Sequence, residues 1–155
     1  MVQLILCIAS GGYTGYLPKA PGTWGSLVAL PIHFLLTRLA PERYWAALVG
    51  IFLLAVYTAG SAEKIIDRKD PGIIVIDEIV GMLIALIAIP ASPVLWVAAF
   101  LLFRFFDIVK PWPVSWADRH LNGGLGVVMD DVLAGVYAWL ALHGALLFVS
   151  VFSQG

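Results

Sequence analysis

Charged side chains are scarce in this sequence. Asp, Glu, Lys and Arg together make up 12% of its 155 residues, whereas 61% of the residues are apolar and the mean hydropathy is +0.96. Soluble domains usually carry about 25% charged residues and a smaller apolar share. The composition therefore predicts a membrane protein, and the length fits a single domain that covers residues 1–155.

Other absences exclude whole classes of function. The net charge is only −1, so the chain lacks the basic stripe that binding to nucleic acid requires. Cys7 is the only cysteine, which rules out an internal disulfide, a zinc-finger spacing and a redox pair. No cationic stretch precedes the apolar N-terminal run MVQLILCIA, and this favours a short surface helix or buried anchor over a cleaved signal peptide.

Familiar nucleophile and nucleotide motifs are also missing. Cys7 has no Cys-x₅-Arg loop, and no serine stands in a Gly-x-Ser-x-Gly elbow, which argues against a cysteine phosphatase and an acyl hydrolase. The sequence has no Walker lysine loop. An Asp-Gly-x₂-Ala-Arg signature, expected of a phospholipid phosphotransferase, is absent as well.

Apolar runs dominate what remains, and they predict an all-α, multipass transmembrane helical bundle with four to five membrane segments. A span over 44–62 has nineteen residues without charge, long enough for a hydrocarbon core of about 30 Å. A second, over 132–152, is interrupted only by His143. Two further apolar runs, 79–89 and 94–106, the second of which contains Arg104, are short enough to form a tilted hairpin. The segment from Trp24 to about Leu39 completes the set.

Threading these segments back and forth brings the polar residues to one side of the membrane. That side carries seven cations and the other carries two, Arg38 and Arg43, so the positive-inside rule makes the polar side cytoplasmic. We therefore expect the polar residues, and any site that they form, to lie on the cytoplasmic side of the membrane. The seven cations are Lys19, Lys64, Arg68, Lys69, Arg104, Lys110 and Arg119.

Two Gly- and Pro-rich stretches between the apolar runs are expected to be loops. The first is SGGYTGYLPKAPGTWGS, which carries Lys19. The second follows Pro111 and Pro113, which stop a helix, and contains Asn122-Gly123-Gly124 and Gly126. Asp130 and Asp131 would then open the last span.

Acidic residues concentrate at the side predicted to be cytoplasmic. Five carboxylates so close together cannot all stay ionised without cations, and a hard divalent ion resolves this. Mg²⁺ prefers carboxylate oxygens and shares its shell with substrate phosphates. Arg104, Lys110 and Lys19 would hold the phosphate oxygens, so the pattern predicts metal-assisted phosphoryl chemistry. The candidate metal ligands are Asp77, Glu78, Asp107, Asp130 and Asp131.

Two other readings of the same carboxylates remain open. Acidic residues at helix starts often serve as caps and dipole partners. Carboxylates inside membrane segments also build proton relays, so an ion- or proton-coupled transporter is the alternative function. A relay would distribute its acids through the depth of the bundle, whereas these acids gather at one mouth beside Arg104 and Lys110.

Several of these stretches together resemble the phosphatidylglycerophosphatase A family, bacterial membrane phosphatases of phospholipid synthesis. The resemblance covers about residues 20–136 and is carried by PGTWGS, DEIVGM, FRFFDIVKPWP, WADRHLNGGLGVVMDD and VLAG. It implies Mg²⁺-dependent hydrolysis of phosphatidylglycerophosphate to phosphatidylglycerol and phosphate. It also implies metal and phosphate roles for Asp77, Glu78, Arg104, Asp107, Lys110, Asp130 and Asp131.

Overall fold

The computed structural model describes residues 1–152, and within that range the chain forms seven α-helices, one 3₁₀-helix and no strand. The all-α prediction is therefore confirmed. The predicted domain 1–155 includes three residues, 153–155, that lie outside the described range. The elements are α1 (Val2–Ala9), η1 (Thr14–Tyr16), α2 (Pro21–Leu36), α3 (Pro41–Ile66), α4 (Ile76–Ala85), α5 (Pro93–Val109), α6 (Val114–His120) and α7 (Gly123–Phe152).

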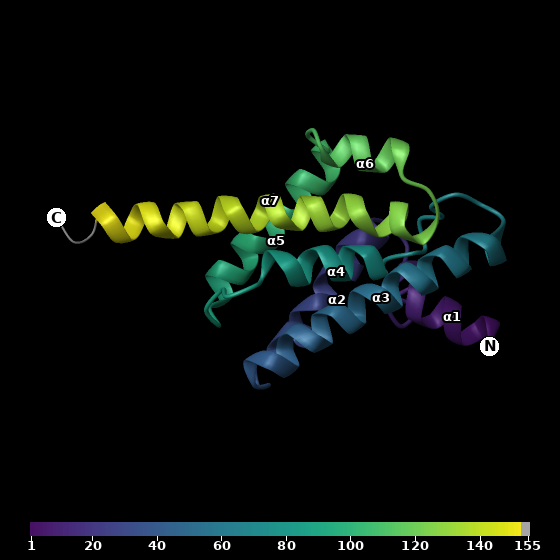
Figure 1. Cartoon of the computed structure of the whole chain (residues 1–155), viewed down its shortest axis with the longest axis horizontal. Helices are drawn as coiled ribbons and strands as arrows, with labels where there is room; N and C mark the ends of the chain where they lie inside the picture. The colour runs from purple at the N-terminus through teal and green to yellow at the C-terminus, as the bar shows by residue number, and fades with distance from the viewer. Residues whose placement is uncertain (153–155) are drawn as a thin grey trace.

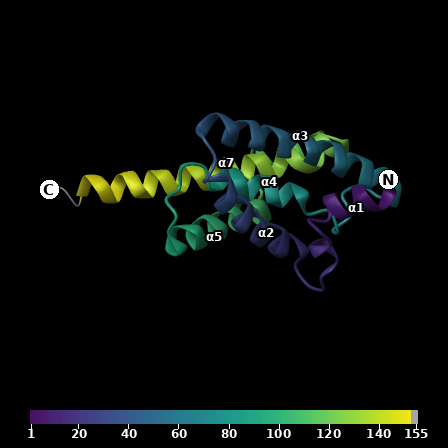
Figure 2. The same cartoon turned by 90° about the horizontal axis from the view of Figure 1, so that it is seen from below.

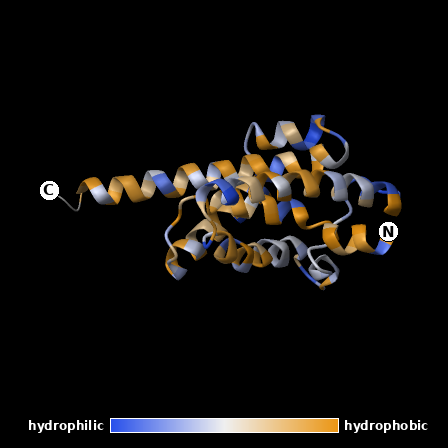
Figure 3. Ribbon diagram, turned by 60° about the horizontal axis from the view of Figure 1, so that its bottom comes forward, coloured by the Kyte–Doolittle hydropathy of each residue, from blue (hydrophilic) through white to orange (hydrophobic). Residues whose placement is uncertain are grey.

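The short helix α4 lies at the centre of the bundle and contacts α2, α3, α5 and α7 (Figures 1 and 2). Eight of its ten residues are buried, and Ile79, Met82 and Leu83 are among the largest fully buried side chains. The long helix α7 packs on α3, α4, α5 and α6, and its C-terminal part projects beyond the other helices. Much of the ribbon, including this projecting part, is coloured hydrophobic in Figure 3.

Proline and left-handed residues set the helix boundaries. Pro21, Pro41 and Pro93 occupy the first position of α2, α3 and α5, where a missing N–H costs nothing and the fixed φ suits a helix. Helix α5 ends at Val109, and its C-cap is Lys110, whose φ of 46° is left-handed and whose N–H donates a hydrogen bond to the carbonyl of Phe106. The chain therefore turns away from the axis of α5 at Lys110, just before Pro111.

The predicted count of four to five membrane segments is wrong by the measure of helix length. Among the described residues, two helices, α3 and α7, are long and apolar enough to cross a membrane. Helix α4 rises only about 15 Å, half of the hydrocarbon thickness, at 1.5 Å per residue. Its sequence is apolar because other helices surround it, and a hydropathy pattern does not distinguish a protein core from lipid.

Both predicted loops are also partly helical. PGTWGS forms the start of α2, because Pro21 begins that helix. Helix α7 begins at Gly123, before Asp130 and Asp131, and includes Gly124 and Gly126. A Cβ on Gly124 would collide with the backbone of Val56 in α3, so this glycine permits close packing of α7 on α3.

A second glycine contact holds α4 against α7. A Cβ on Gly135 would collide with the carbonyl oxygen of Gly81, and one on Gly81 would lie 2.6 Å from the carbonyl oxygen of Asp131. The two backbones touch here without intervening side chains. This crossing places the first turn of α4, with Asp77 and Glu78, beside the part of α7 that carries Asp131.

Candidate active site

Three carboxylates from two helices meet at one end of the bundle. Asp77 and Glu78 come from the first turn of α4 and Asp131 from α7, and one carboxylate oxygen of each lies within 4.8 Å of the others. Asp77 is 7% and Asp131 3% exposed. We call Asp77, Glu78 and Asp131 the carboxylate trio.

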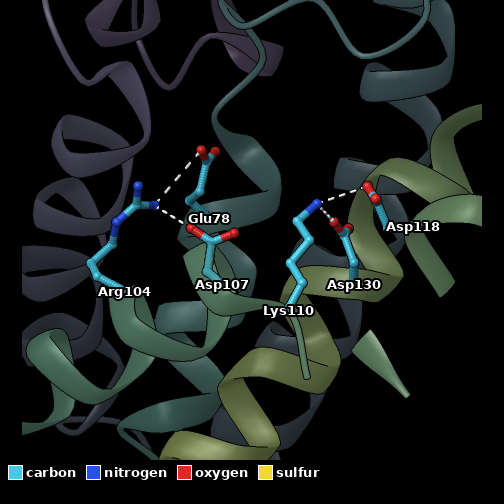
Figure 4. Close-up of polar contacts among 6 residues, drawn as sticks. All are labelled: Glu78, Arg104, Asp107, Lys110, Asp118 and Asp130. Atoms are coloured by element: carbon cyan, nitrogen blue, oxygen red, sulfur yellow. Dashed lines mark hydrogen bonds and ion pairs between the residues drawn. The ribbon is translucent and has the colours of Figure 1, made fainter. Parts of the chain in front are cut away.

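Arg104 borders the trio on the side of α5. Its Nη1 lies 2.6 Å from Oδ2 of Asp107, one turn later in the same helix, and 4.0 Å from Oε1 of Glu78 (Figure 4). The same guanidinium and the Glu78 carboxylate abut Gly22 of α2, where a Cβ would lie 2.8 Å from Nη1. The glycine of PGTWGS therefore provides the space in which this ion pair lies.

Lys110 lies at the centre of a second group of charges. Its Nζ donates hydrogen bonds of 2.7 Å to Oδ1 of Asp118 in α6 and of 2.7 Å to Oδ2 of Asp130 in α7 (Figure 4). Burial alone would lower the pKa of Lys110, but the bonds to Asp118 and Asp130 outweigh it and raise the pKa above that of free lysine. Lys110 therefore remains a cation at neutral pH.

Charge in this region is unbalanced. Six carboxylates surround two cations, Arg104 and Lys110, and the ion pairs of those cations leave Asp77 and Asp131 without a cationic partner among the described residues. Three carboxylate oxygens are buried without a hydrogen bond, namely Oδ1 of Asp77, Oε2 of Glu78 and Oδ1 of Asp130. Buried polar atoms are rarely left unpaired, and a set of hard oxygen donors fits a divalent cation such as Mg²⁺.

Helix capping does not explain these residues. Asp131 and its neighbour Asp130 lie in the third turn of α7, well past its start at Gly123. Asp107 lies near the C-terminal end of α5, where a negative charge opposes the helix dipole. Asp77 and Glu78 do occupy the first turn of α4, but its N-cap is Val75, and no side chain caps the helix.

The predicted site residues thus lie together, with one exception. Lys19 is exposed in the loop before α2, and it makes no ion pair in the part of the chain that the structure describes. Its phosphate role stays a prediction. The metal and phosphate roles of the others also stay predictions, because proximity alone does not assign them.

Three participants are absent from the predicted site residues. Gly22 and Asp118 lie in stretches that the sequence predicts as loops, and the partners of Gly22 lie far away in the chain. Asp70 lies outside the predicted site residues, yet it lines a small cavity together with Asp118 and Asp130. The Pro71-Gly72 turn that leads directly into α4 is the one local signal that could have drawn attention to Asp70.

Comparison with known proteins adds the decisive observation. The sequence matches the family described as Phosphatidylglycerophosphatase A over residues 7–146. The chain belongs to the phosphatidylglycerophosphatase A family. The Phosphatidylglycerophosphatase A of Escherichia coli (strain K12) is 42% identical to this chain over 130 residues. That of Haemophilus influenzae is 41% identical to this chain over 140 residues. These matches cover 83% and 89% of this chain and 76% and 86% of the relatives.

A further relative carries a different name. A protein of Bacteroides thetaiotaomicron described as a putative phosphatidylinositol-3-phosphatase is 41% identical over 146 residues, which is 90% of this chain and 91% of the relative. No solved structure matches the chain.

Membership in the phosphatidylglycerophosphatase A family makes the chain a phosphatase, a phosphoric monoester hydrolase of phospholipid metabolism. Together with the two apolar helices, it makes the chain a bacterial membrane protein with a phospholipid substrate. Nothing in the comparisons supports the transporter alternative. The gathering of the acids at one end of α4 also differs from a relay spread through the depth of the bundle.

Proposed function

We propose that this phosphatase hydrolyses phosphatidylglycerophosphate to phosphatidylglycerol and phosphate at a Mg²⁺ site in the carboxylate trio. One observation carries the proposal: Asp77, Glu78 and Asp131 bring oxygens within 4.8 Å of one another, and Asp77 and Asp131 are buried without a cation. That arrangement is costly unless a positive ion shares the site. The family supplies the phosphoryl chemistry that such an ion serves.

The trio would hold the metal, with Asp107 and Asp130 next to it as further ligands or as acceptors for metal-bound water. Oδ1 of Asp130 is buried and unpaired, while its Oδ2 accepts the bond from Lys110. Bound Mg²⁺ supplies Lewis acidity toward a phosphoryl oxygen and neutralises charge there. The reaction adds water across the phosphomonoester P–O bond and yields the lipid alcohol and inorganic phosphate.

Arg104 and Lys110 would bind the substrate phosphate with donors that their ion pairs leave free. Lysine has three N–H donors, and Lys110 uses two of them on Asp118 and Asp130. Arginine has five donors, and the contact of Arg104 with Asp107 involves only Nη1. Both cations therefore keep donors for phosphate oxygens without releasing the carboxylates that orient them. We infer a third phosphate contact from Lys19.

The depth of the site suits a phospholipid phosphate. From Asp131 to Phe152, α7 rises about 31 Å, close to the hydrocarbon thickness of about 30 Å. With Phe152 at one membrane surface, Asp131 lies at the other, where lipid phosphates are found. The cation bias of the sequence favours the cytoplasmic surface of the inner membrane for the trio. We infer a multipass arrangement in which α3 and α7 cross the bilayer.

The preference for one lipid headgroup can be tested by comparing phosphate release from two lipids. The name of the Bacteroides relative makes phosphatidylinositol 3-phosphate the informative competitor. We expect faster phosphate release from phosphatidylglycerophosphate, because the two relatives described as phosphatidylglycerophosphatase A match this chain over most of its length. Faster phosphate release from phosphatidylinositol 3-phosphate would contradict phosphatidylglycerophosphate as the preferred substrate.

The decisive experiment measures phosphate release from phosphatidylglycerophosphate in detergent micelles, with and without Mg²⁺. We expect activity to require Mg²⁺ and to fall at least a hundredfold in Asp77→Asn, Glu78→Gln, Asp130→Asn and Asp131→Asn. A matched control is Glu42→Gln, which removes an exposed carboxylate at the start of α3. Full activity in the presence of a chelator, or near-normal turnover of a folded Asp131→Asn protein, would contradict the metal site.

A further inference from the structure

An apolar groove runs along the face of α3 that meets α4. It is lined by α3 side chains between Trp45 and Phe52, by Val80, Leu83 and Ile84 of α4, by Ile87 in the turn after α4, and by Val132 of α7. The cavity volume is about 190 Å³. Apart from the Trp45 indole nitrogen, the lining side chains have no polar atom. The groove therefore offers hydrogen bonds to almost no ligand and suits a hydrocarbon.

The groove starts about one helical turn along α4 from the carboxylate trio. Val80 follows Asp77 by three residues, Ile84 lies one turn further along the same side of α4, and Ile87 lies in the turn after that helix. Val132, which also lines the groove, is the residue after Asp131 in α7. A ligand whose polar end is held at Asp77 would therefore find this apolar channel one helical turn further along α4.

The dimensions fit one acyl chain. From Val80 to Ile84 the groove follows α4 for about 6 Å and then continues to Ile87 in the turn after the helix, within the 15 Å or so that one leaflet of the hydrocarbon core provides. Its volume is below the roughly 300–1,000 Å³ of pockets that enclose a whole drug-sized ligand. A headgroup would not fit the groove, whereas a narrow chain would.

The far end of the groove limits how long that apolar path is. At Trp45 and Ile87 it meets a second cavity of about 370 Å³ that is also lined by His33 and Tyr44. Both ring nitrogens of His33 and the hydroxyl of Tyr44 are buried without a hydrogen-bond partner. Polar atoms in need of partners disfavour hydrocarbon, so the apolar path ends there.

We propose that the groove between α3 and α4 binds one acyl chain of the lipid substrate and thereby positions its phosphate at the trio. This inference rests on the proposed function, because it requires a lipid phosphomonoester as substrate. Burial of methylenes in the groove would contribute to kcat/KM for long-chain lipids. A water-soluble substrate with very short chains would not gain this contribution.

The test compares two forms of phosphatidylglycerophosphate, one with sixteen-carbon chains and one with four-carbon chains, through phosphate release. Ile84→Trp fills the groove from α4, and Val49→Trp narrows it from α3 at a position 56% exposed. We expect either change to lower the ratio of long-chain to short-chain kcat/KM about tenfold, the equivalent of about two lost methylene contacts. Val97→Trp in α5, 57% exposed and outside the groove, should keep the wild-type ratio.

The possible results separate the two proposals. A wild-type enzyme that hydrolyses both lipids, with an unchanged ratio in folded Ile84→Trp and Val49→Trp, would overturn the groove and leave the proposed function intact. The same fall in Val97→Trp would show that any added bulk has this effect and would also overturn the groove. A wild-type enzyme inactive on both lipids would instead overturn the proposed function, and the groove assignment with it.

Discussion

Replacing Gly22 with alanine should separate activity from stability. Gly22 occupies the second position of α2, and alanine at a helical position is favoured over glycine by about 1 kcal/mol. The added Cβ, however, would overlap Oε1 of Glu78 and lie 2.8 Å from Nη1 of Arg104. The Glu78 carboxylate must therefore move by on the order of 1 Å, and its flexible side chain allows this at little cost in folding free energy.

The displacement of the Glu78 carboxylate should instead lower the catalytic rate. A misplacement of about 1 Å at a reacting centre can reduce the rate about a hundredfold, which corresponds to about 2.7 kcal/mol of transition-state stabilisation. We therefore expect Gly22→Ala to keep its unfolding temperature in detergent within a few degrees and to lose between tenfold and a hundredfold in kcat for phosphate release. Both quantities should be measured on the same preparation.

A matched control exists in α3. A Cβ on Gly50 meets nothing within 4 Å, so Gly50→Ala should gain helix stability and keep its kcat. If Gly22→Ala is folded and turns over at the wild-type rate, then the position of Glu78 beside Arg104 does not matter for catalysis. That result would remove Glu78 from the proposed metal site.

Three further predictions follow from the geometry. Arg104→Lys keeps the charge but loses the planar fork, so kcat/KM should fall tenfold or more, on the order of 1.4 kcal/mol, while the Mg²⁺ dependence is unchanged; nearly full activity would make Arg104 a structural partner of Asp107. Lys110→Ala should raise KM through weaker phosphate binding, and an unchanged KM with lost Mg²⁺ activation would show that the phosphate and metal roles are reversed. In a Cys7→Ser background, a membrane-impermeant thiol reagent should label Ser92→Cys in intact cells and miss Asn122→Cys; labelling at Asn122→Cys would refute the cytoplasmic placement of the site.

The gathering of acidic residues at one end of the molecule was predictable, because consecutive membrane helices run in opposite directions and this fixes the side on which each helix end lies. Once the apolar runs are placed in antiparallel order, Asp77 at the start of one helix and Asp131 near the start of another fall at the same end. The structure shows this arrangement, with Arg104 and Lys110 beside them. The only local signal that this prediction needed was the presence of charged residues within apolar sequence.

The number of long membrane helices was not predictable in the same way. Leucine and isoleucine in α4 are as apolar as those in α3, but α4 is buried by its neighbours, whereas much of α3 is exposed. Glycine was misleading for a similar reason. Gly124 and Gly135 look like flexible positions in the sequence, but they permit two helix backbones to touch, and that role depends on a partner far away in the chain.

The arrangement of Asp130 and Asp131 has a mechanical consequence. Consecutive residues on a helix point about 100° apart, so α7 directs Asp131 to the trio and Asp130 to Lys110. A rotation of α7 that withdraws one carboxylate must displace the other, and the backbone contact between Gly135 and Gly81 opposes such a rotation. Insertion of a single residue between Asp131 and Gly135 would turn both carboxylates by about 100° relative to α4. We therefore expect the spacing from these acids to the glycine to be as strict a requirement for activity as we propose the acids themselves to be.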